Sequence, residues 1–277
     1  MTPDEYCQQK AAASGSSFYY SFLYLPAERR RAITALYAFC REVDDAVDEP
    51  GEPQVAAAKL AWWRAELANL FAGKPQHPVT QALAPHTQSY AISREKLNEI
   101  IDGMEMDLTQ TRYLDWAGLE RYCYRVAGVV GFLAAGIFGY RNARTLDYAK
   151  DLGIAFQLTN IIRDVGEDAR KNRIYLPMED LKRFGLPAAD ILKLRETPAF
   201  RSLMEFEAER ARSYYDRALA ALPSEDRRAQ RPGLIMAAIY RTLLKEMERD
   251  GFPVLTQRIS LTPLRKFWIA WRTWAGA

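Results

Sequence analysis

The sequence predicts a single all-α domain. Nearly every long segment repeats its apolar residues at helical spacing, and few segments show the alternation of a β-strand. Prolines and glycines separate these segments, but no Gly/Ser-rich linker and no internal repeat divides the 277 residues. A bundle of helices around one core is the simplest architecture for such a chain. The predicted helices cover residues 3–13, 17–24, 27–48, 54–72, 93–108, 114–139, 144–167, 188–195, 199–221, 233–250 and 263–274.

Composition excludes several classes of site. With a formal net charge of +3, the chain gives no indication of a nucleic-acid partner, and none is expected. The scattered cysteines, Cys7, Cys40 and Cys123, indicate reduced thiols in a cytosolic protein. With only His77 and His86 present, there is little basis for a His-based triad or zinc site. No signal peptide and no apolar run long enough to span a bilayer is visible, so a cytoplasmic location is expected.

An acidic run, Arg41–Glu49, closes the helix predicted over residues 27–48. At 100° per residue, one polar stripe beside the core face contains Tyr37, Arg41, Asp44 and Asp48. Asp44 and Asp48 are one turn apart near a helix C-terminus, where like charges and the helix dipole both cost stability. A bound cation would offset that cost. The alternative is a solvated acidic helix end.

A second acidic face lies in the helix predicted over 144–167 and just beyond its end. Within an arc of about 80°, this face carries Gln157, Asn160, Asp164 and Asp168. Carboxylates and a carbonyl oxygen are ligands for a hard cation, and Mg²⁺ prefers to share its coordination with phosphate oxygens. The basic residues Arg163, Arg170, Lys171 and Arg173 follow closely and suit the remaining oxygens of a diphosphate. An amide network that ties helices together is the alternative.

The helix predicted over 114–139 offers a lining between these two faces. Tyr124, Gly128, Gly131 and Ala135 share one face within about 60°. Small residues there either admit a neighbouring helix or leave room for a ligand. An apolar chamber capped by acids and arginines would suit a long hydrocarbon with a diphosphate head, and aromatic faces would stabilise a carbocation. The acidic cluster at Asp102–Asp107 is assigned a supporting role, such as hydrogen bonds behind the site.

These motifs resemble the squalene/phytoene synthase family. The resemblance runs from about Ser14 to about Gly251 and rests on Ser16–Phe18, Tyr37–Asp45, Tyr122–Gly128 and Gln157–Asp168, in this order. It implies an isoprenoid synthase fold with a central cavity between helices. It also implies head-to-head (1'–1) condensation of two prenyl diphosphates with Mg²⁺, or Mn²⁺ in its place.

The resemblance also implies roles for individual residues. The metal sites would be Asp44, Asp48, Asn160, Asp164 and Asp168. Diphosphate or substrate would be bound by Ser14, Gly15, Ser16, Ser17, Phe18, Tyr37, Arg41, Gln157, Arg163, Arg173 and Tyr240. Arg41 and Arg163 would also take part in catalysis, and Tyr124 would assist proton removal.

Within the family, two stretches are most like bacterial presqualene diphosphate synthases of hopanoid biosynthesis, Ala12–Tyr19 and Ile101–Asp107. The expected substrate is therefore farnesyl diphosphate, and NADPH is not expected. Phytoene, squalene and dehydrosqualene synthases are the alternatives within the family. A non-catalytic helical scaffold is the alternative of another class, but such a relative would be expected to lose the acidic residues.

The C-terminal segment Leu264–Trp274 combines tryptophans with basic residues. As an amphipathic helix it would suit a membrane surface, which would make the protein peripheral at the inner membrane. The alternative is a terminal helix whose tryptophans dock on the body of the protein. Oligomeric state cannot be predicted from these patterns.

Overall fold

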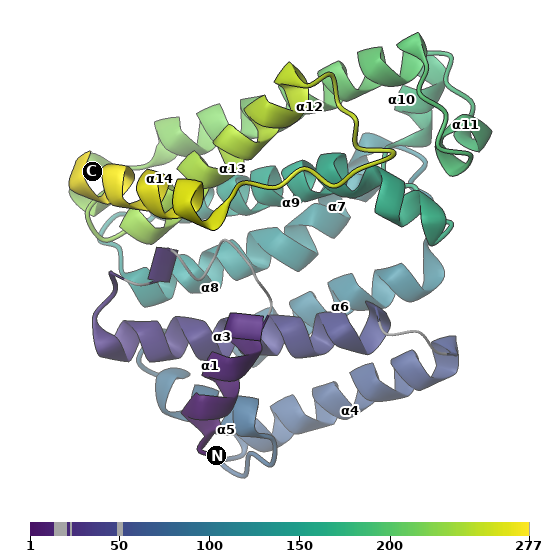
Figure 1. The fold of residues 1–277 in the computed structure, drawn as a ribbon. Helices are drawn as coiled ribbons and strands as arrows, with labels where there is room; N and C mark the ends of the chain where they lie inside the picture. Colours follow the sequence, from purple (N-terminus) through teal and green to yellow (C-terminus); the bar gives the residue numbers. More distant parts are fainter. Residues whose placement is uncertain (14–20, 23, 49–51, 277) are drawn as a thin grey trace.

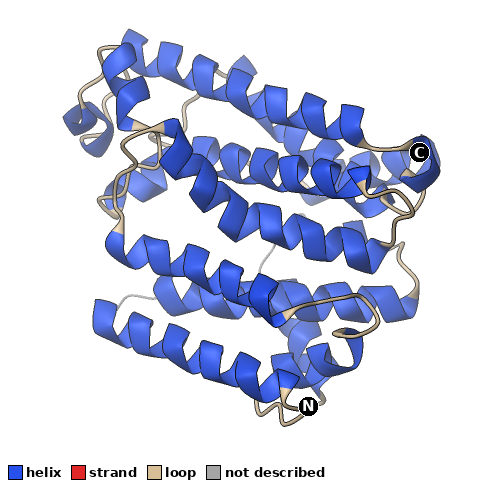
Figure 2. Ribbon diagram, turned by 180° about the vertical axis from the view of Figure 1, so that it is seen from behind, coloured by secondary structure: helices blue, strands red, loops and turns tan. Residues whose placement is uncertain are grey.

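The computed structural model describes residues 1–13, 21–22, 24–48 and 52–276, and this part of the chain is a bundle of helices without a β-strand (Figures 1 and 2). The all-α fold class is thus confirmed. The α-helices are α1 (Pro3–Ala13), α3 (Ala27–Asp48), α4 (Pro53–Phe71), α5 (Pro78–Leu83), α6 (Arg94–Thr109), α7 (Trp116–Cys123), α8 (Val129–Phe138), α9 (Arg144–Arg170), α10 (Met178–Arg183), α11 (Ala188–Leu192), α12 (Pro198–Ala221), α13 (Arg231–Arg249) and α14 (Pro263–Gly276). Three short turns, η1 (Ala84–His86), η2 (Tyr124–Gly128) and η3 (Ser224–Asp226), complete the helical elements.

Two apolar clusters make up the core. One gathers residues of α1, α3, α4, α5, α6 and α8, and the other gathers residues from α7 and α9 to the C-terminal helices. In Figure 1 the N-terminal helices α1, α3 and α4 lie below α8, and α9, α12, α13 and α14 lie above it. The helix that runs through α7, η2 and α8 therefore lies between the two halves, where it contacts both clusters.

This middle helix explains an apparent membrane signal. Residues Trp116–Phe138 are long and apolar enough, by length and composition, to cross a bilayer. This differs from the expectation that no apolar run is long enough to span a bilayer. In the fold, α8 packs against α9 and contributes Leu133, Ile137 and Phe138 to the core. Its apolar composition thus follows from its central position in the bundle.

Close packing explains the small residues on this helix. A Cβ atom added at Gly131 would lie 2.3 Å from the Ala149 carbonyl oxygen, and one added at Gly153 would lie 2.4 Å from the Ala127 carbonyl oxygen. Gly131 therefore lets α8 approach the backbone of α9, and Gly153 of α9 lets the η2 turn do the same. The small residues on this helix were expected either to admit a neighbouring helix or to leave room for a ligand. At Gly131 they admit a neighbouring helix, and the same residue also lines a cavity.

Most predicted helices are confirmed, with differences at a few places. The α5 and α10 helices, six residues each, were not predicted. The α9 helix continues to Arg170, three residues past its predicted end, and α11 ends at Leu192. The segment predicted as a helix over 17–24 falls largely outside the described residues. A π-helical turn at η2 interrupts the regular period of the predicted 114–139 helix.

Candidate active site

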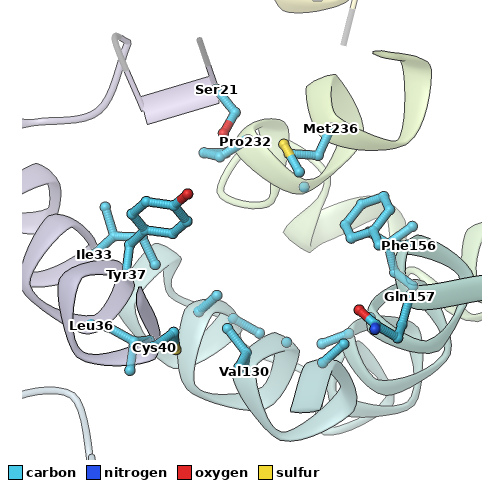
Figure 3. Close-up of a pocket in the computed structure, with 18 of the residues that line it drawn as sticks. Ser21, Ile33, Leu36, Tyr37, Cys40, Val130, Phe156, Gln157, Pro232 and Met236 are labelled. Atoms are coloured by element: carbon cyan, nitrogen blue, oxygen red, sulfur yellow. The ribbon is translucent and has the colours of Figure 1, made fainter. Parts of the chain in front are cut away.

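One elongated cavity runs between α3, α8, α9 and α13 (Figure 3). Its empty volume, open mouth included, is about 1170 Å³. Polar side chains gather at one end, where Arg41 and Asp44 of α3 lie near Gln157 and Asn160 of α9. The rest of the wall is mainly apolar and contains Phe22, Ile33, Leu36, Met104, Val126, Ala127, Val130, Ala134, Ala135, Phe138, Leu152, Phe156, Pro232 and Met236. The predicted chamber with a polar end is therefore present.

The α3 side of the polar end is a dense charge cluster. The Arg41 guanidinium donates one hydrogen bond to Asp44 and another, of 2.6 Å, to Asp45 Oδ1. Lys10 Nζ lies 2.9 Å from Asp45 Oδ2 and thereby neutralises the carboxylate that was assigned no ligand role. Burial raises the pKa of Asp44 to about 6 despite the adjacent Arg41 charge. A bound cation would stabilise the ionised form of this buried carboxyl group.

The α9 side supplies the second set of oxygens. Asn160 Nδ2 lies 3.5 Å from Gln157 Oε1, which leaves Asn160 Oδ1 buried without a hydrogen-bond partner. Burial and the Asp164 charge raise the pKa of Asp168 to about 7. The pKa of Asp164 moves the other way: burial would raise it, but the Arg163 and Arg258 guanidinium groups hold it below its usual value.

The two acidic helix ends are joined by the segment that follows α9. Arg173 donates from Nη1 to Asp48 Oδ1 at 3.4 Å and from Nη2 to the Asp107 carbonyl oxygen at 3.3 Å. The Asp107 side chain is buried and accepts 2.8 Å hydrogen bonds from the hydroxyls of Tyr122 and Tyr175. The structure thus brings together the predicted acidic stripes of α3 and α9, and it places Asp107 directly behind them.

Sequence comparison supplies the family. The squalene/phytoene synthase profile matches residues 11–265, which is most of the chain. This chain belongs to the squalene/phytoene synthase family. Members act on isoprenyl diphosphates, and a small-molecule substrate of this class is consistent with the cavity.

Relatives of the whole chain agree. A 15-cis-phytoene synthase from Synechocystis sp. is 35% identical over 282 residues, covering 96% of this chain and 84% of the relative. A phytoene synthase from Arthrospira platensis is 35% identical over 275 residues, covering 95% of this chain and 89% of the relative. Among solved structures, a dehydrosqualene synthase has a TM-score of 0.88 at 29% identity and covers 99% of this chain and 96% of its own. A squalene synthase from Alicyclobacillus acidocaldarius has a TM-score of 0.80 at 28% identity and covers 90% of this chain and 94% of its own.

The described residues do not by themselves form a complete metal site. Among the described residues, no group of three or more His, Cys, Asp or Glu side chains gathers around one metal position. Mg²⁺ is ordinarily held by one or two carboxylates together with water and phosphate oxygens. The buried, unpaired Asn160 Oδ1 and the raised pKa values of Asp44 and Asp168 suit that arrangement. The donor set is therefore incomplete by itself and appropriate for a diphosphate-bound ion.

Tyr124 of the synthase lies away from the cavity wall. It belongs to the π-helical turn, and its hydroxyl accepts a 3.2 Å hydrogen bond from Lys96 Nζ of α6. Among the described residues of this helix, Tyr122 lines the cavity and Tyr124 does not. Its role in proton removal stays a prediction, and the contact with Lys96 gives that role no direct geometric support.

The remaining predicted contacts divide into three groups. Tyr37 and Gln157 line the cavity from opposite sides (Figure 3). Tyr240 is buried behind the site, where its hydroxyl is hydrogen-bonded to Arg163 and its ring lies 4.9 Å from that of Phe156. It therefore supports Arg163 rather than bordering the cavity. The Ser14–Phe18 segment lies outside the described residues.

Two site residues had no signal in the sequence. Arg258, in the connection between α13 and α14, lies 3.0 Å from Asp164 Oδ1, although 94 residues separate them in sequence. Tyr175 reaches Asp107 from the segment after α9. Both lie in irregular segments, where helical periodicity gives no information on facing direction. For Asp107, the acidic pattern of α6 gave the only hint.

Proposed function

We propose that this enzyme condenses two farnesyl diphosphates head to head (1'–1) and releases presqualene diphosphate and diphosphate. The observation that carries the proposal is a single, mainly apolar cavity whose lining also contains Arg41 and Asp44 of α3 and Gln157 and Asn160 of α9. An apolar cavity holds a hydrocarbon chain by the hydrophobic effect, and the charged end fixes its diphosphate. Farnesyl diphosphate, Mg²⁺ and a cytoplasmic location are parts of the same proposal.

The first step is ionisation of one substrate. The bond between C1 and the diphosphate oxygen breaks, and its electron pair leaves with the diphosphate. Arg41 lines the cavity at the end where that negative charge develops, and Arg163, outside the lining, holds positive charge beside Asp164. Bound Mg²⁺ would supply further Lewis-acid stabilisation of the leaving group.

The walls of the cavity suit the cation that remains. The rings of Tyr37 and Phe156 line it from opposite sides (Figure 3), and an aromatic face attracts positive charge. Enclosure by apolar side chains also excludes water, which would otherwise capture the cation. The 2,3-double bond of the second farnesyl diphosphate then attacks C1, and loss of a proton closes the cyclopropane ring.

The released diphosphate is the base that we favour for this proton. It is formed beside the cation, whereas the Tyr124 hydroxyl contacts Lys96 outside the cavity lining. Tyr124→Phe is then expected to retain most activity. Loss of more than about 100-fold in kcat, the lower range for a general acid or base, would instead assign the proton to Tyr124.

Phytoene synthesis from two geranylgeranyl diphosphates is the second candidate. It is favoured by the relatives reported above, since both curated sequences at 35% identity are phytoene synthases. Product analysis decides between the candidates: the purified enzyme is incubated with farnesyl or geranylgeranyl diphosphate, each with and without NADPH. Presqualene diphosphate as the product from farnesyl diphosphate, unchanged by NADPH, supports the proposal. Phytoene formed at a higher kcat/KM supports the second candidate, and the absence of any condensation product contradicts both.

A further inference from the structure

The outer side of α14 is the most hydrophobic exposed helix face in the described part of the molecule. Among the described residues, eleven large hydrophobic side chains are exposed. Five of the eleven belong to α14: Leu264, Phe267, Trp268, Trp271 and Trp274. Of the other six, three lie on α4, and Met1, Leu114 and Tyr140 lie outside the helices. Soluble surfaces rarely gather aromatic groups in this way unless the patch contacts another body.

The helix separates its apolar residues into two faces. At 100° per residue, Leu264, Phe267, Trp268 and Trp271 fall within about 100° of one another. Ile269 and Ala270 point the opposite way and are buried, with exposures of 8% and 1%. The helix therefore docks on α13 through a small inner face and presents a larger aromatic face outward.

Specific contacts hold α14 in this orientation. Arg265 Nη2 lies 2.7 Å from Glu246 Oε1 of α13. At the other end, the Trp274 ring stacks on Tyr24 with a centroid distance of 5.3 Å, and the Arg231 guanidinium lies 5.6 Å from the same ring. Because both ends are attached, the exposed tryptophans do not reach the core by rotation of the helix. The expectation that the terminal helix docks on the body of the protein is thus met at Trp274, whereas membrane binding by the outer face stays a prediction.

The charge of this region is one-sided. Residues 251–277 contain four basic side chains, Arg258, Arg265, Lys266 and Arg272, and no acidic one. Two of the four pair with carboxylates of other helices, Arg258 with Asp164 and Arg265 with Glu246. Arg272 is exposed and lies 5.3 Å from the Trp268 ring centroid. Cationic and aromatic side chains on one helix face suit a layer of anionic headgroups above hydrocarbon, because tryptophan rings occupy that boundary.

The helix is also close to the apolar part of the cavity. Tyr24, on which Trp274 stacks, is two residues from Phe22 of the cavity wall, and Arg231 directly precedes Pro232 of the same wall. A surface-bound α14 would therefore bring the hydrocarbon end of the cavity next to the lipid phase.

We propose that the outer face of α14 docks the enzyme on an anionic lipid bilayer, with Phe267, Trp268 and Trp271 at the headgroup boundary. The docking does not depend on the proposed reaction, although a lipid-soluble substrate tail and product would give it a use. The partner is a lipid surface rather than a second copy of the chain, because like-charged α14 faces would repel each other.

Vesicle co-sedimentation tests the proposal with the full-length protein. Vesicles of phosphatidylcholine alone are compared with vesicles that also contain phosphatidylglycerol, at low and high salt. We expect binding to the anionic vesicles that weakens with salt. The variant with both Trp268→Ala and Trp271→Ala should bind the vesicles at least about tenfold more weakly, since affinity follows the apolar area inserted. Trp62→Ala is the matched control, because Trp62 is 48% exposed on α4, away from this face.

Three outcomes would overturn the docking proposal. The wild-type enzyme could remain in the supernatant with anionic vesicles, or the double variant could sediment as well as the wild type. Sedimentation velocity without lipid could also show a dimer that the double variant loses, which would make the face a protein interface. Turnover of detergent-dispersed substrate is measured on the same samples. Normal turnover without vesicle binding rejects the docking alone, and vesicle binding without turnover rejects the proposed function alone.

Discussion

Arg173 Nη1 lies 3.4 Å from Asp48 Oδ1, so the segment after α9 reaches the C-terminal end of α3. Lys171 Nζ approaches the same oxygen at 3.7 Å. These contacts connect the C-terminal ends of the two acidic helices, near the place where Asp44 and Asn160 line the cavity. Arg173 therefore holds the helix ends together, and we propose that it also carries charge for the diphosphate.

The two bases in this segment should respond differently to mutation. The Arg173 side chain is 16% exposed and also binds the Asp107 carbonyl, whereas that of Lys171 is 52% exposed. We expect Arg173→Ala to lower kcat/KM by about 10²–10³-fold, the loss typical of one electrostatic contact to the transition state. Lys171→Ala should change it by only a few-fold. A continuous assay of diphosphate release measures both, and equal losses in the two variants would contradict this assignment.

Two positions on α8 separate helix packing from cavity shape. Gly131→Ala would place a Cβ atom 2.3 Å from the Ala149 carbonyl oxygen and is expected to destabilise the fold by about 1–3 kcal/mol. Ala134 lines the cavity, so Ala134→Phe should shorten it and lower the use of geranylgeranyl relative to farnesyl diphosphate. Urea unfolding measures the first effect and substrate competition the second. An unchanged substrate ratio in Ala134→Phe would show that this part of the wall does not contact the chain.

A buried carboxyl group far from the cavity predicts the pH dependence of stability. Glu207 of α12 is 2% exposed, and its neighbours are Arg210, at 2.6 Å, and Asp180, which Arg210 also binds. Burial raises the pKa of Glu207 to about 7 in spite of the Arg210 charge. Between the unfolded pKa and this value, the native state keeps a proton that the unfolded chain has lost. Stability must then fall as pH rises toward 7.

The size of this effect can be measured with one substitution. Glu207 should contribute at most about 3 kcal/mol to the loss of stability between pH 5 and pH 8. Glu207→Gln keeps the shape but does not titrate, so its free energy of unfolding should vary less with pH in that interval. Glu205→Gln, an exposed neighbour on the same helix, serves as the control. A pH dependence in Glu207→Gln as steep as in the wild type would contradict the assignment.

The local sequence pattern was sufficient to predict most of the helices and the polar faces of α3 and α9. The period of apolar residues gave the long helices, and the same arithmetic placed Gln157, Asn160, Asp164 and Asp168 on one face. The short helices α5 and α10 were not predicted, since six residues are too few to show a period. The prediction that α3 and α9 face each other needed a functional argument, because helix periodicity says nothing about which helices become neighbours.

The failures have specific physical causes. The π-helical turn at Tyr124–Gly128 changes the angular spacing, so a face computed at 100° per residue does not carry from Tyr124 into α8. Arg258 reaches Asp164 from an irregular segment, and its contact depends on the packing of α13 and α14. The small residues near Gly131 were consistent with packing or with a ligand, and only the position of the Ala149 backbone distinguishes the two.

The central claim is that α3 and α9 jointly hold a diphosphate through Mg²⁺. A thermal-shift titration with a non-hydrolysable farnesyl thiodiphosphate, with and without Mg²⁺, tests it most directly, because a ligand of the native state raises the unfolding temperature. Asp44→Asn and Asp164→Asn take one carboxylate from each helix, and Asp102→Asn on α6 is the control. We predict a Mg²⁺-dependent shift in the wild type and the control, and its loss in each of the two site variants. A shift that is independent of Mg²⁺, or that survives both substitutions, would contradict the claim.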